Sequence, residues 1–235
     1  MTDTRDMTTV LADERRRLAR VGTAERVTEI LREQITAGRF APGTRLSEEK
    51  IADALGVSRN TLREAFRLLG HEKLVVHELN RGVFVRVLTA EEVSDLYLLR
   101  QIVECSALVL AARSGTPDLT RVVNAVEQAE TAAVEKRWHE VATLDLQFHQ
   151  ELVALAHSPR LDDLMRRLLA ELRLAFHIMS SSGQFHEPYV LRNRNLVTLL
   201  QHGKADDASR ELQSYLKDAL SQLLRAFTGG ETTAE

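Results

Sequence analysis

The stretch TRLSEEKIADALGVSRNTLREAFRLL, residues 44–69, decides the fold of the N-terminal part of the chain. Ser47 can cap a first helix, whose first turn is acidic, as the helix dipole favours. Gly56 can adopt the left-handed conformation that ends a helix, and Ser58 can cap a second helix almost at once. The stretch therefore predicts two short helices joined by a tight turn.

The second of these helices has two distinct faces. Its inner stripe contains the apolar residues Leu62, Phe66 and Leu69. Its outer stripe contains the cationic residues Arg59, Arg63 and Arg67. In a helix-turn-helix, the start of the second helix meets base edges in the major groove, where arginine binds guanine. We therefore expect duplex DNA to contact Ser58, Arg59, Asn60, Thr61 and Arg63. The alternative is an ordinary helix pair with a solvated basic face.

A hairpin is expected directly after the helix pair. Residues 74–87 alternate apolar and polar side chains around Asn80-Arg81-Gly82, which is a strong turn signal. The tip can lie along phosphates or enter a minor groove. Apolar residues at helical spacing predict a further helix over residues 25–37, and Gly38 ends it. Three helices and a β-hairpin make a winged helix-turn-helix, and its further expected DNA contacts are Arg45, Arg81 and Gly82.

This N-terminal part resembles the GntR superfamily of bacterial transcription regulators. The matching residues are Pro42-Gly43, Leu46, Ala52 to Leu55, Gly56-Val57-Ser58-Arg59, Leu62-Arg63-Glu64-Ala65, Leu74-Val75 and Arg81-Gly82. Many members carry a DNA-binding arginine where this chain has Glu49. Glu49 is therefore left out of the expected DNA contacts.

Composition and charge favour two domains with different partners. The chain has 235 residues and a net charge of −3. Residues 1–88 have 16 basic and 13 acidic side chains, whereas residues 89–235 have 15 and 21. A basic N-terminal part and an acidic C-terminal part are expected if only the N-terminal part binds the phosphates of a nucleic acid. The lone Cys105 excludes an internal disulfide framework and is interpreted as a small core residue.

The sequence also indicates where the chain acts and how it is divided. No apolar run approaches the ~18 residues of a membrane span, and no signal peptide is recognisable, so we expect a cytoplasmic protein. Arg15-Arg16-Arg17 is either a solvated charge run or a contact to the DNA backbone. We expect a flexible tail over residues 1–20, a DNA-binding domain over 21–88, a helical effector-binding and dimerisation domain over 89–228, and a disordered end over 229–235.

The second domain is expected to be helical throughout, which makes the fold class mainly α. Helical spacing and breakers predict helices over residues 91–113, 118–136, 139–157, 161–180, 189–202 and 205–227. Six helices with short connections imply an antiparallel bundle. This part resembles the FCD ligand-binding domain of the FadR subfamily, through Leu99-Arg100, Glu104, Ala111-Ala112, Asp145, Phe148-His149, Gly203, Ala208 and Leu216.

Asp145 and His149 are the candidate metal ligands of this domain. Four residues apart, they share one helix face and can reach the same zinc or nickel ion. Metal-binding FCD domains add two histidines, and this chain has Asn193 and Tyr215 at those positions. The histidines that could substitute are His177, His186 and His202. The alternative is that Asp145 and His149 form a buried, mutually satisfied polar pair.

The resemblance also implies a pocket for small organic acids. Arg100 can pair with a carboxylate, unless it forms an internal salt bridge with Glu104 one turn away. The expected effector contacts are Arg100, Asp145, His149, Arg173, Asn193 and Tyr215.

The function expected from the sequence is that of a DNA-binding transcription regulator, and not an enzyme. A homodimer would place two recognition helices about one DNA turn apart on a palindromic operator, and an effector could change that spacing. Repression is the usual outcome in the family. The alternatives are a metal-dependent sensor or hydrolytic enzyme that uses Asp145 and His149, and an architectural DNA-binding protein without an effector.

Overall fold

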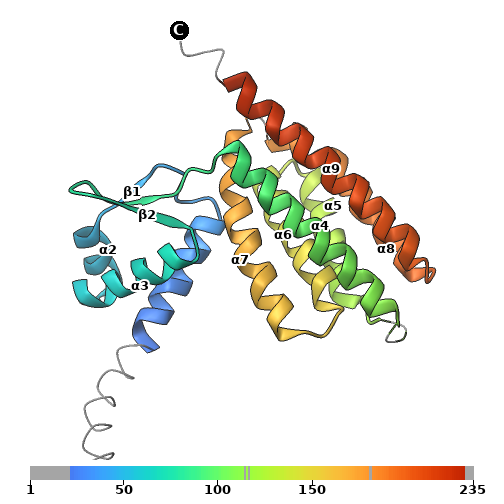
Figure 1. Cartoon of the computed structure of the whole chain (residues 1–235), viewed down its shortest axis with the longest axis horizontal. Coiled ribbons are helices and arrows are strands. Elements are labelled where there is room, and N and C mark those ends of the chain that lie inside the picture. The colour runs from blue at the N-terminus through green and yellow to red at the C-terminus, as the bar shows by residue number, and fades with distance from the viewer. Residues whose placement is uncertain (1–21, 114, 116, 180–181, 231–235) are drawn as a thin grey trace, which may run out of the picture. The chain divides into compact units, whose positions relative to one another are not determined.

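A computed structural model describes residues 22–113, 115, 117–179 and 182–230 of the chain. The chain divides into two compact units between Arg86 and Val87. The elements of both units are labelled in Figure 1. The expected N-terminal tail, with its arginine run, and residues 231–235 of the expected disordered end lie outside the described residues.

The N-terminal unit is a winged helix-turn-helix, as expected. Its first helix is described over residues 22–36. The remaining elements are β1 (Arg45–Leu46), α2 (Glu48–Leu55), α3 (Arg59–His71), β2 (Val75–Glu78) and β3 (Gly82–Val85). The strands form an antiparallel sheet in the order β1-β3-β2. Only a two-stranded hairpin was expected, because a strand of two residues is too short to show periodicity.

The tight turn between α2 and α3 forms as its residues predict. The Ser47 side chain accepts a hydrogen bond from the Lys50 backbone N–H, which caps α2. Gly56 ends that helix with φ 63°, a left-handed conformation that glycine adopts without a Cβ clash. The Ser58 side chain then accepts from the Thr61 N–H and caps α3.

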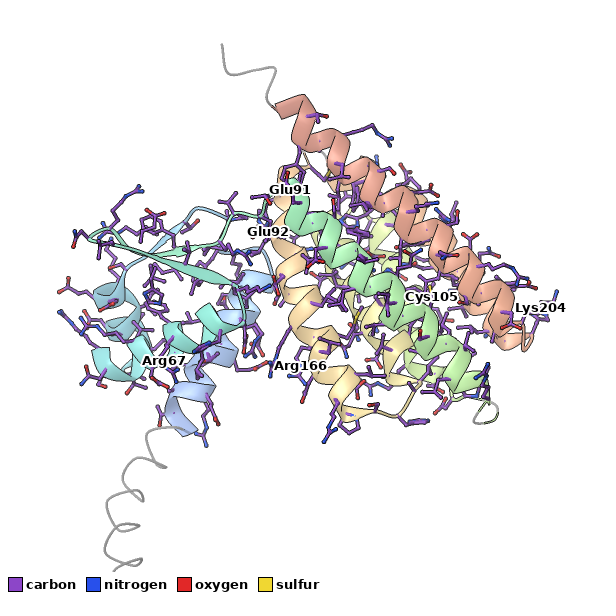
Figure 2. All side chains as sticks on the ribbon, in the orientation of Figure 1. Arg67, Glu91, Glu92, Cys105, Arg166 and Lys204 are labelled. Atoms are coloured by element: carbon purple, nitrogen blue, oxygen red, sulfur yellow. The ribbon has the colours of Figure 1, made fainter. Side chains whose placement is uncertain are left out.

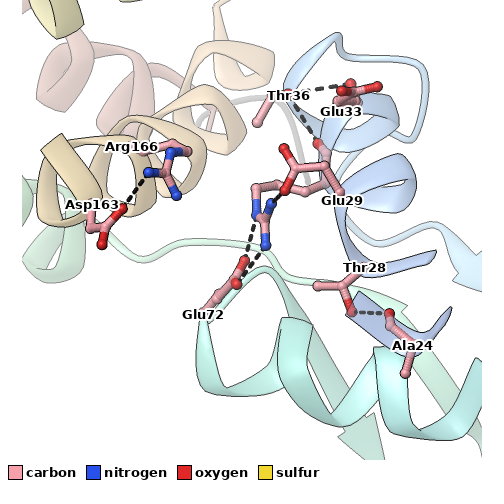
Figure 3. Close-up of polar contacts among 9 residues, drawn as sticks. Ala24, Thr28, Glu29, Glu33, Thr36, Glu72, Asp163 and Arg166 are labelled. Atoms are coloured by element: carbon pink, nitrogen blue, oxygen red, sulfur yellow. Dashed lines mark hydrogen bonds and ion pairs between the residues drawn. The ribbon is translucent and has the colours of Figure 1, made fainter. Parts of the chain in front are cut away.

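The core of this unit lies between α3, the first helix and the sheet. Leu62, Phe66 and Leu69 of α3 are fully buried, so the expected inner stripe is confirmed. The side chains of the unit are drawn in Figure 2, where Arg67 marks α3. Arg32 of the first helix donates from Nε and Nη2 to the two carboxylate oxygens of Glu72, each at 2.7 Å, and Glu72 lies at the end of α3 in Figure 3. This bidentate pair connects two helices that are distant in the sequence.

The C-terminal unit is an all-helical bundle. Its helices are α4 (Ala90–Arg113), α5 (Thr120–Val134), α6 (Trp138–Ala154), α7 (Pro159–Ala175), α8 (Ser182–Gln201) and α9 (Ala205–Gly230). The 3-10 turn η1 (Phe176–Ile178) follows α7. Helix α4 packs mainly against α9, and α5 against α6 (Figure 1). None of the helices in the described ranges is both long enough and apolar enough to cross a bilayer.

Several helix ends differ from the expectation. Helix α8 begins at Ser182 rather than Tyr189, with Pro188 inside it. The side chain of Phe185 in this first part of the helix is buried, and its packing offsets the missing proline donor. Helix α9 continues to Gly230, so residues 229–230 are not part of a disordered end. Helix α7 ends at Ala175, because the chain tightens there into η1.

Gly56→Ala should destabilise the N-terminal unit by about 1 kcal/mol, since an alanine in the left-handed region is strained even without a clash. A Cβ at position 56 would meet no atom within 4 Å, so backbone strain is the only penalty. Gly70→Ala, inside α3, is the matched control and should be neutral or stabilising. Urea unfolding measures both, and equal midpoints for the two variants would contradict the turn assignment.

Candidate functional site

The exposed face of α3 contains the arginines that were expected to contact DNA. The side chains of Arg59, Arg63 and Arg67 are 61%, 62% and 58% exposed. Asn60 is exposed beside them. Ser58 and Thr61 are hydrogen-bonded to each other through their hydroxyl groups at 2.8 Å, so their side chains also serve the helix cap. The face thus presents guanidinium groups at the start of the helix.

Two of these arginines form ion pairs with α2. Arg59 Nη2 lies 3.1 Å from Glu49 Oε1, and Arg63 Nε lies 2.8 Å from Glu48 Oε2. The pairs are solvent-exposed, and such pairs contribute only about 0–1 kcal/mol. They orient the guanidinium groups but cannot hold them against the stronger field of a phosphate backbone. Glu49, which stands where many GntR-like sequences are expected to carry an arginine, therefore pairs with Arg59 of α3.

The hairpin of β2 and β3, which we call the wing, brings together three further residues that were expected to contact DNA. The Arg81 side chain is 71% exposed at the tip, pairs with Glu78 and lies 5.4 Å from the Phe84 ring centroid. Gly82 has φ 108°, and a Cβ placed there would lie 3.5 Å from Arg45 Nε. Arg45 of β1 therefore lies beside the wing, a contact that follows from the pairing of β1 with β3.

A second polar group is buried inside the bundle. It contains Arg100 and Glu104 from α4, Asp145 and His149 from α6, Asn193 from α8 and Tyr215 from α9, and each of these residues is at most 7% exposed. We call these six residues the buried polar cluster. Four helices therefore contribute to one interior site.

Glu104 joins two helices within this cluster. Its Oε1 accepts from Arg100 Nε at 2.6 Å, and its Oε2 lies 2.7 Å from His149 Nδ1. The internal salt bridge that was the alternative for Arg100 is therefore present. Burial alone would raise the pKa of Glu104, but the charges of Arg100 and His149 outweigh burial and hold this pKa below its ordinary value.

Asp145 forms the other half of the cluster. Its Oδ1 accepts from Asn193 Nδ2 at 2.8 Å and from the Tyr215 hydroxyl at 3.0 Å. His149 Nε2 lies 4.0 Å from the same oxygen but 3.2 Å from the Tyr215 hydroxyl oxygen. Asp145 and His149 are thus not a direct hydrogen-bonded pair, since Tyr215 stands between them. Burial opposes ionisation of Asp145, but His149, His186 and the Asn193 hydrogen bond keep its pKa below the ordinary value.

Several buried polar atoms around this cluster have no hydrogen-bond partner among the described residues. They are Arg100 Nη2, Arg173 Nε and Nη1, His186 Nδ1 and Asn193 Oδ1. Burial lowers the pKa of Arg173 to about 10, although Asp145 opposes this shift, so Arg173 remains charged at pH 7. Each such group costs about 1–3 kcal/mol, and more when it is charged. Three of the five atoms belong to guanidinium groups, which bind anions in fixed geometry.

Comparison with known protein families identifies both units. Residues 23–85 match the model of bacterial regulatory proteins of the gntR family, and residues 95–218 match the FCD domain. The chain belongs to the GntR family. This GntR-family chain is a transcriptional regulator with a C-terminal FCD domain.

Named relatives agree with this assignment. The Nta operon transcriptional regulator of Aminobacter aminovorans is 32% identical, and the match covers 82% of this chain and 90% of the relative. The gluconate operon transcriptional repressor of Bacillus licheniformis is 32% identical over 60% of this chain and 58% of its own length. A crystal structure from Rhodococcus sp. RHA1, described as a transcriptional regulator GntR, is 45% identical with a TM-score of 0.81 and covers 86% of this chain and 98% of that one. These relatives are regulators and not enzymes.

The donor atoms of this GntR-family regulator do not fit the zinc or nickel site that was expected from the resemblance to metal-binding FCD domains. Asn193 turns its NH₂ group toward Asp145, and the Tyr215 hydroxyl also donates there. His202 is exposed, with Nδ1 2.7 Å from the Thr198 carbonyl oxygen, and His177 is exposed too. Within the described ranges, no group of three His, Cys, Asp or Glu side chains is placed to hold a metal ion. Two ligands leave a tetrahedral ion incomplete.

His186 was named from the sequence only as a possible substitute ligand, and its place inside α8 was missed. It is 1% exposed, and its ring centroid lies 5.0 Å from that of Phe176 and 4.8 Å from that of Phe185. Burial lowers the pKa of His186 to about 4, only partly offset by Asp145. Had α8 been extended back to residue 182, helical spacing would have placed His186 two turns before Asn193 on the same face.

His186 should make the bundle less stable as the pH falls from 7 toward 4.5. An unfolded histidine gains its proton near pH 6.5, whereas the buried ring stays neutral until about 4, so acid favours the unfolded state. The full effect is on the order of 3 kcal/mol. Urea unfolding across this pH range should show a flatter slope for His186→Gln but an unchanged slope for His202→Gln. Equal slopes in all three proteins would contradict the buried, neutral assignment.

Proposed function

We propose that the chain is a repressor that binds a palindromic operator as a homodimer in the bacterial cytosol and is released by a small organic anion. The observation that carries the effector part is the set of unpaired guanidinium atoms beside the buried polar cluster. The observation that carries the DNA part is the exposed arginine face of α3 together with the wing.

The DNA-binding geometry supports a two-fold arrangement. A helix-turn-helix presents the start of its second helix to the major groove, and a dimer reads two half-sites about one helical turn apart. Arg59 and Arg63 occupy the first and second turns of α3, so their side chains can reach neighbouring base pairs. Arg81 and Arg45 lie together at the wing and suit phosphate or minor-groove contacts.

The effector chemistry follows from charge and hydrogen-bond capacity. Arg100 Nη2 and the two unpaired Arg173 atoms are donors, and a carboxylate has the acceptor oxygens that they lack. One relative is named for a gluconate operon, and gluconate is a carboxylate. A further acceptor, Asn193 Oδ1, suits a hydroxyl group on the same ligand.

Ligand binding would act on the helix packing through Arg100. A carboxylate that accepts from Arg100 Nη2 would pull on the same guanidinium whose Nε donates to Glu104, and Glu104 in turn contacts His149 of α6. Helices α4 and α6 would then pack differently in the bound and free states. An effector that prefers one packing shifts the population toward it, and that shift is the regulatory step.

Arg59→Ala and Arg63→Ala should each weaken operator binding at least tenfold and relax sequence preference, because each removes a base-reading guanidinium. Arg81→Ala should weaken binding to all sequences more uniformly, as loss of a phosphate contact does. The probe is the duplex that the full chain selects from a random library, measured by fluorescence anisotropy at fixed salt.

The control for these variants is Arg210→Ala in α9, which removes an arginine of similar exposure from the other unit. It should bind the selected duplex as the original chain does. If Arg59→Ala and Arg63→Ala also bind normally, α3 is not the recognition helix.

Arg173→Leu should abolish the rise in melting temperature that a matching carboxylate causes, while the free protein stays folded, because an unpaired buried charge is removed. The probes are gluconate, lactate, citrate and hexanoate, each with its uncharged alcohol or amide. Arg166→Leu, an exposed arginine on the same helix, is the matched control and should keep the shift.

Two results would replace this proposal. If none of the four carboxylates raises the melting temperature, the organic-anion assignment falls. If the purified chain contains one zinc or nickel per subunit, and His149→Ala loses it, the site is a metal sensor. Elemental analysis decides this second case.

A further inference from the structure

Helix α4 exposes large apolar side chains on the face that points out of the bundle. Leu98, Ile102 and Leu110 are 55%, 57% and 48% exposed. They share one side of the helix with the exposed Ser106, while Arg100 and Glu104 lie on the buried side. Figure 1 shows α4 beside α9. Large apolar side chains gathered on one exposed helix face are normally covered by a partner.

The sequence of this outer face is symmetric about residue 104. Ile102 and Ser106 lie two residues from it, Leu98 and Leu110 six, and the exposed, oppositely charged Asp95 and Arg113 nine. The half-buried Leu99 and Val109 are five residues from it on either side. If two copies of α4 crossed antiparallel at this point, each position would lie level with its counterpart. Asp95 of one copy would then lie level with Arg113 of the other, about 14 Å from the centre.

A shallow groove next to this face can receive a side chain of the second copy. The groove has a volume of about 500 Å³ and is lined by Cys105, Ser106, Val109, Leu110, Arg113 and Ser209. In this arrangement, Leu98 of the second copy would lie level with Val109 and Leu110. Both residues line the groove together with Cys105. In an isologous interface each copy presents the same surface to the other, so Leu98 of each copy would face the groove of its partner.

We propose that this face of α4 is the surface through which two copies of the chain associate, with the two helices antiparallel about a two-fold axis at the level of residue 104. The inference rests on the homodimer of the proposed function and adds where and in which register it forms. Asp95 and Arg113 lie at equal distances on either side of residue 104, so two antiparallel copies would place opposite charges at both ends of the interface. This self-complementary arrangement favours a second copy of the chain over an unrelated partner.

Charge reversal tests this register directly. Asp95→Arg and Arg113→Asp should each weaken self-association at least tenfold in sedimentation equilibrium, since like charges would meet at both ends. Mixing the two single variants should restore association as a heterodimer, and the double variant should restore the homodimer. This pattern arises only if position 95 faces position 113 of the other copy.

A second test concerns the apolar contact of Ile102 near the proposed two-fold axis. Ile102→Glu should leave the chain monomeric with unchanged helix content by circular dichroism, whereas Leu191→Glu, at a 74% exposed position on α8, should leave the dimer intact. If the original chain is a dimer that none of the α4 variants disturbs, or if the mixture shows no heterodimer, the proposed interface is wrong and the dimer stands. If the original chain is monomeric both free and on its selected duplex, the dimer of the proposed function falls as well.

Discussion

The packing of the helical unit depends on the requirement that a charge inside a protein be compensated. Glu104 is fully buried and accepts from Arg100 on its own helix and from His149 on α6. Loss of one partner from such an arrangement leaves an uncompensated buried charge, which costs about 3–5 kcal/mol. Asp145, Asn193 and Tyr215 extend the same requirement to α8 and α9. The positions of four helices are therefore fixed by polar geometry as well as by apolar contact.

The DNA-binding unit handles its charges in the opposite way. The α3 arginines Arg59 and Arg63 pair with acidic side chains in solvent, where each pair contributes little. Such pairs can exchange for a phosphate or a base edge without a large loss of stability. The chain thus has exchangeable ion pairs on the face that we propose to bind DNA, and buried, fully enclosed ones inside the helical bundle.

Local signals predicted most of the fold, and distant contacts explain what they missed. Capping residues such as Ser47 and Ser58, and Gly56 between them, predicted the helix-turn-helix because their effect is confined to one turn of chain. The Arg100–Glu104 pair was also open to prediction, since four residues bring side chains together on any helix. The Tyr215 hydroxyl between Asp145 and His149 could not be predicted, because it depends on the relative rotation of α6 and α9. The place of His186 was missed for a local reason, since the expected helix began at Tyr189, after Pro188, whereas α8 begins at Ser182.

The acidic partners of the α3 arginines also bear on how fast the regulator finds its target. Glu48, Glu49 and Glu64 neutralise Arg63, Arg59 and Arg67 respectively, so this face has little net charge at a distance. In the proposed complex, this neutralisation would lower the long-range attraction between α3 and the DNA polyanion. Fewer condensed counterions would then be released on binding than the number of arginines implies, so the affinity would fall less steeply with salt.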